Sequence, residues 1–194
     1  MSNSFTRREA IGGAALGAGA ATLGGMQAMA QTGPRKTFVL IHGAYHGGWC
    51  WRKVVDILEK QGHKVYAPSL TGLGDRAHLF NTSIDLDTHI QDVVQLLEME
   101  DLENVILVGH SYAGLVITGA ADRVPARIRR LVYLDAFIPE DGKAAIDYIA
   151  PERAARQRAQ AEATGALEGL PVAALGVTDP ADISWVESRN RLQP

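Results

Sequence analysis

The sequence is poor in cysteine, in net charge and in long apolar runs, and each shortage excludes a class of protein. Cys50 is the only cysteine among 194 residues, so no internal disulfide can form, and no spacing of Cys and His resembles a metal site. We therefore expect no metal and no other cofactor. A formal net charge of −3 offers no basic surface for nucleic acid. No apolar stretch is strong enough to form a stable membrane span.

The overall composition is that of one globular domain. Hydrophobic residues make up 46% of the chain and charged residues 21%, which is enough apolar material to bury a sizeable core at this length. One basic run, Arg127 to Arg130 around Ile128, comes just before an apolar segment. We interpret this run as a solvated helix end.

Residues 1–30 differ from the rest of the chain. Arg7 and Arg8 precede a weakly apolar, glycine-rich run, and Ala28-Met29-Ala30 supplies the small-x-small pattern that a signal peptidase cleaves. The segment resembles a twin-arginine export signal, with Ala10 where phenylalanine is commonest. We expect a twin-arginine-type signal peptide over residues 1–30 and a periplasmic or secreted protein. A disordered or anchoring tail is the alternative.

The stretch from Val105 to Leu115 carries the strongest chemical signal. Its apolar start suits a buried central strand, and the segment after Ser111 continues as a helix. Gly109-His110-Ser111-Tyr112-Ala113 is a G-x-S-x-A variant of the nucleophile elbow, a strained strand-to-helix turn with only small residues beside the serine. The elbow predicts Ser111 as a nucleophile and the backbone N–H of Tyr112 as an oxyanion donor. An ordinary turn with a capping serine is the alternative.

Strands alternate with helices along the chain from Lys36. This alternation predicts an α/β fold with a doubly wound, mostly parallel sheet. The expected strands are Thr37–Ile41, Lys64–Ala67, Asn104–Gly109 and Leu131–Leu134. The expected helices are Trp49–Gln61, closed by Gly62, then Asp87–Met99 and Tyr112–Asp122.

The loop after the first strand lies at the carboxyl edge of the predicted sheet, as Ser111 does. Hydrolysis of an ester by serine passes through a tetrahedral oxyanion, which needs two donors already in place. In this architecture the second donor comes from the first loop, where His42-Gly43 precedes Ala44. A tight turn with a packed histidine is the alternative for His42-Gly43.

Four blocks of sequence resemble the α/β-hydrolase superfamily, and within it the small esterases related to plant methyl-ester esterases and hydroxynitrile lyases. The blocks are residues 38–51, 66–76, 109–114 and 131–139. The resemblance implies Ser111 as nucleophile, Ala44 and Tyr112 as oxyanion N–H donors, and a helical cap that begins near Pro139. We therefore divide the chain into a partial hydrolase core over residues 31–138 and a cap segment over residues 139–194.

The resemblance implies a serine carboxylesterase that cleaves small or hydrophobic esters through an acyl-enzyme. Hydroxynitrile lyases of this group carry threonine at the position of Gly43, which favours ester hydrolysis and leaves lyase activity as an alternative. His46 belongs to the loop that passes over the expected pocket, where it would contact the substrate or brace the loop.

No histidine follows Ser111, although α/β-hydrolases place the histidine of the triad last in the chain. We therefore expect a C-terminally truncated esterase, or an inactive relic that binds small apolar ligands. His42 is expected to brace its loop and His110 to point under the sheet, so neither suits the role of base. Asp135, after the last predicted strand, is a candidate acid or a capping residue. The exposed edge of Leu131–Leu134 would favour self-association.

Overall fold

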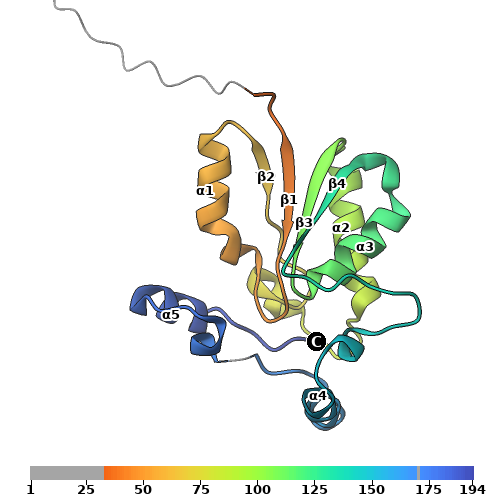
Figure 1. Cartoon of the computed structure of the whole chain (residues 1–194), viewed down its shortest axis with the longest axis vertical. Helices are drawn as coiled ribbons and strands as arrows, with labels where there is room; N and C mark the ends of the chain where they lie inside the picture. The colour runs from red at the N-terminus through yellow and green to blue at the C-terminus, as the bar shows by residue number, and fades with distance from the viewer. Residues whose placement is uncertain (1–32, 170) are drawn as a thin grey trace, which may run out of the picture. The chain divides into compact units, whose positions relative to one another are not determined.

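The computed structural model describes residues 33–169 and 171–194, so the predicted signal peptide lies outside the described residues. The core is a sheet of four parallel strands with helices on both faces (Figure 1). The strands are β1 (Thr37–Ile41), β2 (Lys64–Tyr66), β3 (Val105–His110) and β4 (Ile128–Leu134), in the order β2-β1-β3-β4. The predicted doubly wound parallel sheet is confirmed.

Three α-helices return the chain between successive strands. α1 (Arg52–Lys60) covers one face of the sheet, whereas α2 (Leu86–Met99) and α3 (Ala113–Arg123) cover the other (Figure 1). Because every crossover brings the chain back to the same end of the sheet, the carboxyl ends of all strands meet at one edge. None of the described helices is both long and apolar enough to cross a membrane.

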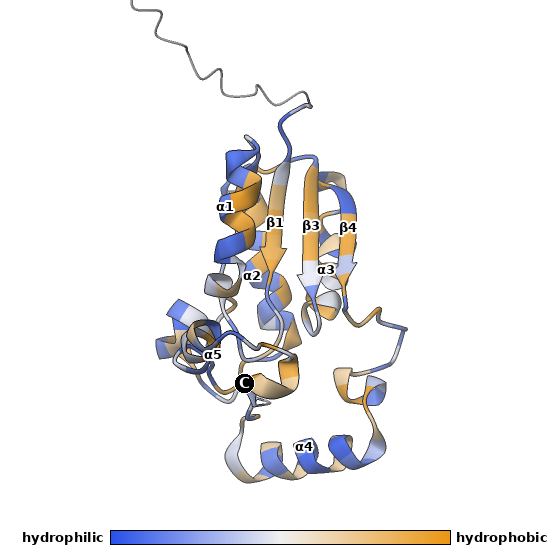
Figure 2. Cartoon of the chain, turned by 60° about the vertical axis from the view of Figure 1, so that its left-hand side comes forward, coloured by the Kyte–Doolittle hydropathy of each residue, from blue (hydrophilic) through white to orange (hydrophobic). Residues whose placement is uncertain are grey.

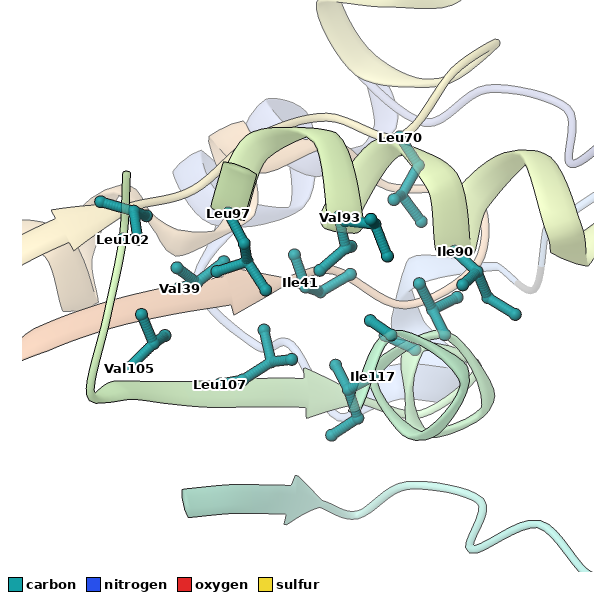
Figure 3. Close-up of a cluster of buried hydrophobic side chains, with 14 of the residues drawn as sticks. Val39, Ile41, Leu70, Ile90, Val93, Leu97, Leu102, Val105, Leu107 and Ile117 are labelled. Carbon is teal, nitrogen blue, oxygen red and sulfur yellow. The ribbon is translucent and has the colours of Figure 1, made fainter. Parts of the chain in front are cut away.

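The larger core lies between the sheet and the helices α2 and α3. Its central side chains are fully buried and come from two strands and both helices (Figure 3): Val39, Ile41, Leu107, Val93, Leu97 and Ile117. Full burial of each such side chain contributes about 1.5–3 kcal/mol. Leu40 and Val108 point to the opposite face and pack on Trp51. The two central strands are therefore apolar on both faces, and Figure 2 shows the apolar residues of β1 and β3.

Two element starts differ from the sequence prediction by three residues, and the other bounds agree to within one residue. The helix expected over Trp49–Gln61 begins with a 3-10 turn, Gly48–Trp51, and only then continues as α1. The last strand begins at Ile128, so only Arg127, the last residue of the 3-10 turn Pro125–Arg127, is a helix end, and the rest of the basic run lies in β4. A register shift opposite Val105 and Ile106 inserts an extra residue, which lets Arg129 and Arg130 stay exposed within β4 while Ile128 packs on the core.

The segment after β4 lies at the carboxyl edge of the sheet and contains α4 (Pro151–Thr164) and α5 (Pro180–Glu187). Paired main-chain hydrogen bonds of 2.8 and 2.9 Å join Leu167 to Gln193. The Gln193 side-chain oxygen accepts from the Tyr45 N–H at 3.2 Å, and the Arg191 N–H donates to the Tyr45 carbonyl at 2.9 Å. The expected cap segment therefore contacts the first loop of the core.

The outer edge of β4 has no neighbouring strand within the described ranges. Because unpaired N–H and C=O groups on an edge strand pair with other chains, we expect self-association that rises with protein concentration. Leu134→Lys should reduce it in sedimentation velocity, since Leu134 is 47% exposed on this edge. Met99→Lys, at a site 72% exposed on α2, is the matched control. Equal association of the two variants would exclude the β4 edge as the contact.

Candidate active site

Ser111 lies at the junction of β3 and α3 with a φ of +54°, in the left-handed region of backbone space. Such a conformation costs a non-glycine residue about 1–3 kcal/mol and persists only where the surroundings hold it. The Ser111 N–H donates to the Leu134 carbonyl at 3.3 Å, and the Ser111 carbonyl accepts from the N–H groups of Phe137 and Gly114, both at 3.1 Å. The backbone therefore forms the strained strand-to-helix turn that the motif predicts.

The small residues around Ser111 are required by close backbone contacts. A Cβ atom on Gly109 would come within 2.7 Å of the Ala113 carbonyl oxygen. A Cβ atom on Gly114 would overlap the carbonyl oxygen of Phe137. Larger side chains would force the elbow away from β4, because close-packed interiors do not absorb such volume.

Two cavities open beside Ser111. The larger has a volume of about 350 Å³ and is lined by Ala44, Ser111 and Tyr112 from the core and by residues of the cap segment. The smaller has a volume of about 90 Å³ and is lined by His46, His110 and Ser111, among others. The structure thus brings Ser111 together with the residues predicted to supply both oxyanion donors. The larger cavity has the size of a small-molecule site.

The two predicted oxyanion donors are backbone N–H groups. Tyr112 directly precedes α3, where the first N–H groups of a helix lack intrahelical acceptors. In the described ranges, no loop or side-chain hydrogen bond uses the N–H of Ala44 or of Tyr112. Both groups therefore remain available to a developing oxyanion.

His42 is fully buried and occupied at both ring nitrogens. Its Nε2 accepts from the Leu70 N–H at 3.0 Å, so Nδ1 carries the proton and donates to the Gly43 carbonyl at 2.8 Å. Burial lowers the pKa of His42 to about 4. His42 is thus a neutral brace for the first loop, as expected, and has no nitrogen free to act as a base.

His46 has a nitrogen free. Its Nδ1 donates to the Ala44 carbonyl at 2.7 Å, and its ring stacks on Trp49 with ring centroids 5.5 Å apart. Because a carbonyl only accepts, the proton of the neutral ring is on Nδ1, and Nε2 keeps its lone pair. His46 lines the smaller cavity with Ser111, and its contact to substrate stays a prediction.

His110 lies elsewhere than expected. The sequence predicts that its side chain points under the sheet, but it lines the smaller cavity beside Ser111. The missing side chain of Gly43 makes this room, since a Cβ atom there would come within 2.9 Å of His110 Nδ1. Burial lowers the pKa of His110, and the charge of Asp135 acts against that shift.

Asp135 is exposed, with a φ of +44°, and lines neither cavity beside Ser111. Its role as an acid stays a prediction. No group of three or more His, Cys, Asp and Glu side chains in the described ranges is arranged to hold a metal ion.

A buried polar chain beneath Tyr112 was not found from the sequence. The Tyr112 hydroxyl lies 3.0 Å from His89 Nδ1, and His89 Nε2 lies 3.0 Å from the Thr71 carbonyl. Because the carbonyl accepts, Nε2 carries the proton and Nδ1 accepts from Tyr112. Asp92 continues the chain, accepting from the Thr71 N–H at 2.6 Å and from Arg76 at 2.9 Å.

The position of His89 carried a signal that the sequence analysis overlooked. His89 lies one helical turn before Val93, on the apolar face of α2, and is 1% exposed. Burial lowers the pKa of His89 and raises that of Tyr112, so both side chains stay neutral near pH 7. The pair fixes the ring of the residue whose N–H is the predicted oxyanion donor.

We expect His89→Phe to reduce the free energy of unfolding by about 1–3 kcal/mol, because it leaves the buried Tyr112 hydroxyl without its acceptor. In a Tyr112→Phe background, His89→Phe should reduce the free energy of unfolding by clearly less. Urea unfolding of the four proteins of this double-mutant cycle measures the difference. Additive effects would contradict a direct His89–Tyr112 interaction.

The lowered pKa of His42 predicts how stability depends on pH. The unfolded chain protonates this histidine near pH 6.5, whereas the folded chain does so only near pH 4. Stability is therefore retained above pH 6.5 and falls as the pH decreases toward 4, by up to about 3 kcal/mol from this group. Chemical unfolding at pH 7 and pH 4.5 should show a smaller pH effect in His42→Gln. An equal pH effect in His42→Gln and the parent would mean that protonation of His42 does not cause the loss of stability at acid pH.

About half of the chain is similar in sequence to known proteins. A carbendazim hydrolyzing esterase from Nocardioides sp. (strain SG-4G) is 59% identical over 105 residues, covering 54% of this chain and 43% of that protein. Methylesterase 2 of Arabidopsis thaliana is 37% identical over 114 residues, covering 58% of this chain and 43% of that protein. The alpha-hydroxynitrile lyase of Arabidopsis thaliana is 40% identical over 104 residues, covering 53% of this chain and 40% of that protein. The chain spans less than half the length of each of these curated relatives.

Solved structures agree with the fold. An extracellular alpha/beta-hydrolase from a Paenibacillus species matches with a TM-score of 0.73 at 30% identity, over 82% of this chain and 67% of that chain. The family model described as the alpha/beta hydrolase family matches residues 38–194, from β1 through the cap segment. With this fold, this elbow and this match, the chain belongs to the alpha/beta hydrolase family.

Proposed function

We propose that the protein is a serine carboxylesterase that cleaves small or hydrophobic esters through an acyl-enzyme, with Ser111 as nucleophile. The observation that carries this proposal is Ser111 held at φ +54° on the wall of a cavity of about 350 Å³, beside Ala44 and Tyr112. The similarity to proteins named as an esterase and as methylesterases supports the same reaction class.

The proposed reaction has two halves. The Ser111 hydroxyl oxygen attacks the ester carbonyl and gives up its proton, while the N–H groups of Ala44 and Tyr112 stabilise the negative oxygen that forms. The tetrahedral intermediate collapses, the alcohol leaves with a proton, and the acyl group stays on Ser111. Water then attacks the acyl-enzyme in the same way and releases the carboxylic acid.

The identity of the base that accepts the Ser111 proton needs an argument of its own. No hydrogen bond joins the Ser111 hydroxyl to a histidine among the described residues. His46 is the best prepared of the histidines beside the cavities, because the Ala44 carbonyl holds the proton on Nδ1 and leaves Nε2 as an acceptor. A base supplied by residues outside this sequence is the alternative.

Gly43 favours ester hydrolysis over the lyase alternative. A Cβ atom at this position would come within 2.9 Å of His110 Nδ1 and 3.2 Å of the Ser111 Cβ. The threonine that hydroxynitrile lyases carry here would therefore displace the ring that packs beside the nucleophile.

We also propose that the protein is exported, on the twin-arginine pattern of residues 1–30. The similarity to an alpha/beta-hydrolase described as extracellular supports a periplasmic or secreted location.

Reaction with a fluorophosphonate probe and turnover of p-nitrophenyl acetate test the proposed function. We expect labelling and turnover that Ser111→Ala abolishes, because the nucleophile is removed. Ser83→Ala, at an exposed serine outside the site, is the matched control. His46→Gln should lower turnover by about 10²-fold if His46 is the base.

Three results would contradict parts of this proposal. Turnover unchanged in Ser111→Ala would show that Ser111 is not the nucleophile. Turnover that needs Ser111 but not His46 would assign the base to another residue. An unlabelled Ser111 in a chain that still binds small apolar esters would identify the inactive relic.

A further inference from the structure

The cap helix α4 presents two polar side chains to the Ser111 cavity. Arg153 and Gln157 are one helical turn apart and therefore lie on the same face of α4. Both are half-buried and line the larger cavity, whereas Arg156 and Arg158 of the same helix are exposed. Arg153 also lines the smaller cavity, so its side chain borders both spaces that open beside the nucleophile.

The guanidinium of Arg153 has no carboxylate partner in the part of the chain that the structure describes. None of the ion pairs there includes Arg153, although Arg158, one turn further along, pairs with Asp147 at 4.0 Å. Arg153 instead interacts with the neutral hydroxyl of Tyr45, which also lies 3.5 Å from Gln157 Nε2. A half-buried cation that forms no ion pair favours an anion in the space beside it.

Asp85 is the acid on the cavity wall, and it is already engaged. Its carboxylate accepts from the Thr88 N–H at 2.9 Å and from the Thr88 hydroxyl at 3.0 Å, which caps the N-terminus of α2. Asp85 is exposed, so solvent screens its charge. The positive charge of Arg153 is therefore not neutralised from this side of the cavity.

The rest of the wall is largely apolar. The largest purely apolar side chains that line the space bordered by Ser111 and Arg153 are Leu86, Phe137, Ile149 and Leu167. Such a wall suits a short hydrocarbon chain between two polar ends of a ligand. One end would be the reacting ester at Ser111, and the other would meet the planar donors of the guanidinium, which match a carboxylate.

We propose that the cavity selects esters that carry a carboxylate at the far end of a short hydrocarbon chain, as monoesters of dicarboxylic acids do, and that Arg153 is the residue that determines this specificity. The inference rests on the proposed function, because it places the ester carbonyl at Ser111. Tyr45, which interacts with Arg153 and lies 3.5 Å from Gln157 Nε2, completes with Gln157 the polar end of the site.

Direct binding tests the inference without turnover. Monomethyl glutarate and the neutral diester dimethyl glutarate are titrated calorimetrically into the full chain carrying Ser111→Ala. We expect the monoester to bind more tightly than the diester. Arg153→Met should weaken monoester binding by about tenfold or more, because it removes a charged hydrogen bond, and should change diester binding by less than about twofold.

Two further variants separate charge from packing. Arg153→Lys keeps the positive charge but loses the planar pair of donors, so it should keep only part of the preference for the monoester, while Arg156→Met, on the exposed face of α4, should change neither affinity. Thermal unfolding confirms that each variant is folded. Equal loss for both esters in Arg153→Met, or no preference for the monoester in the parent chain, would overturn the inference.

The outcomes also separate this inference from the proposed function. Binding that depends on Arg153 in a chain whose Ser111 resists the fluorophosphonate probe would retain the anion site and reject the esterase. Labelled Ser111 without any Arg153-dependent preference would retain the esterase and reject the anion site.

Discussion

The strained backbone of Ser111 is the constraint on which the other features of the site depend. Its left-handed conformation is held by hydrogen bonds on both sides of the residue, to Leu134 at the end of β4 and to Phe137 beyond it. Because β4 and the chain after it hold the elbow, the sheet itself carries the strain. The same turn sets the N–H of Tyr112 at the start of α3. The proposed nucleophile and one predicted oxyanion donor are therefore fixed by one piece of backbone.

Each predicted oxyanion donor is backed by a buried, neutral histidine. His42 braces the loop that leads to Ala44, and His89 accepts from the hydroxyl of Tyr112. Burial lowers the pKa of both histidines, so protonation at acid pH would disturb the two donors together. The cap is linked to the same loop, because the N–H, carbonyl and hydroxyl of Tyr45 all contact cap residues. Movement of the cap would therefore shift the loop that contains Ala44.

Much of the fold was predictable from the sequence because its signals are local. Apolar runs bounded by glycine and proline predicted the strands, and helical spacing predicted α1 and α2, since burial of these faces requires that periodicity. The basic run from Arg127 to Arg130 extends into β4, which differs from the prediction for a physical reason. A β-bulge, which has no reliable local signal, keeps Arg129 and Arg130 exposed inside a strand.

The sequence by itself determined the order of strands and helices, the elbow around Ser111 and the family resemblance, because these depend on neighbouring residues and on spacing along the chain. Only the tertiary structure decided that His89 supports Tyr112, that His110 lines the cavity beside Ser111, and that Arg153 lines the same cavities as Ser111 without a carboxylate partner among the described residues. These features join segments far apart in the chain, and their meaning depends on distance and burial in space. Neither distance nor burial can be read from residue identity alone, because both depend on how the sheet and the cap pack together.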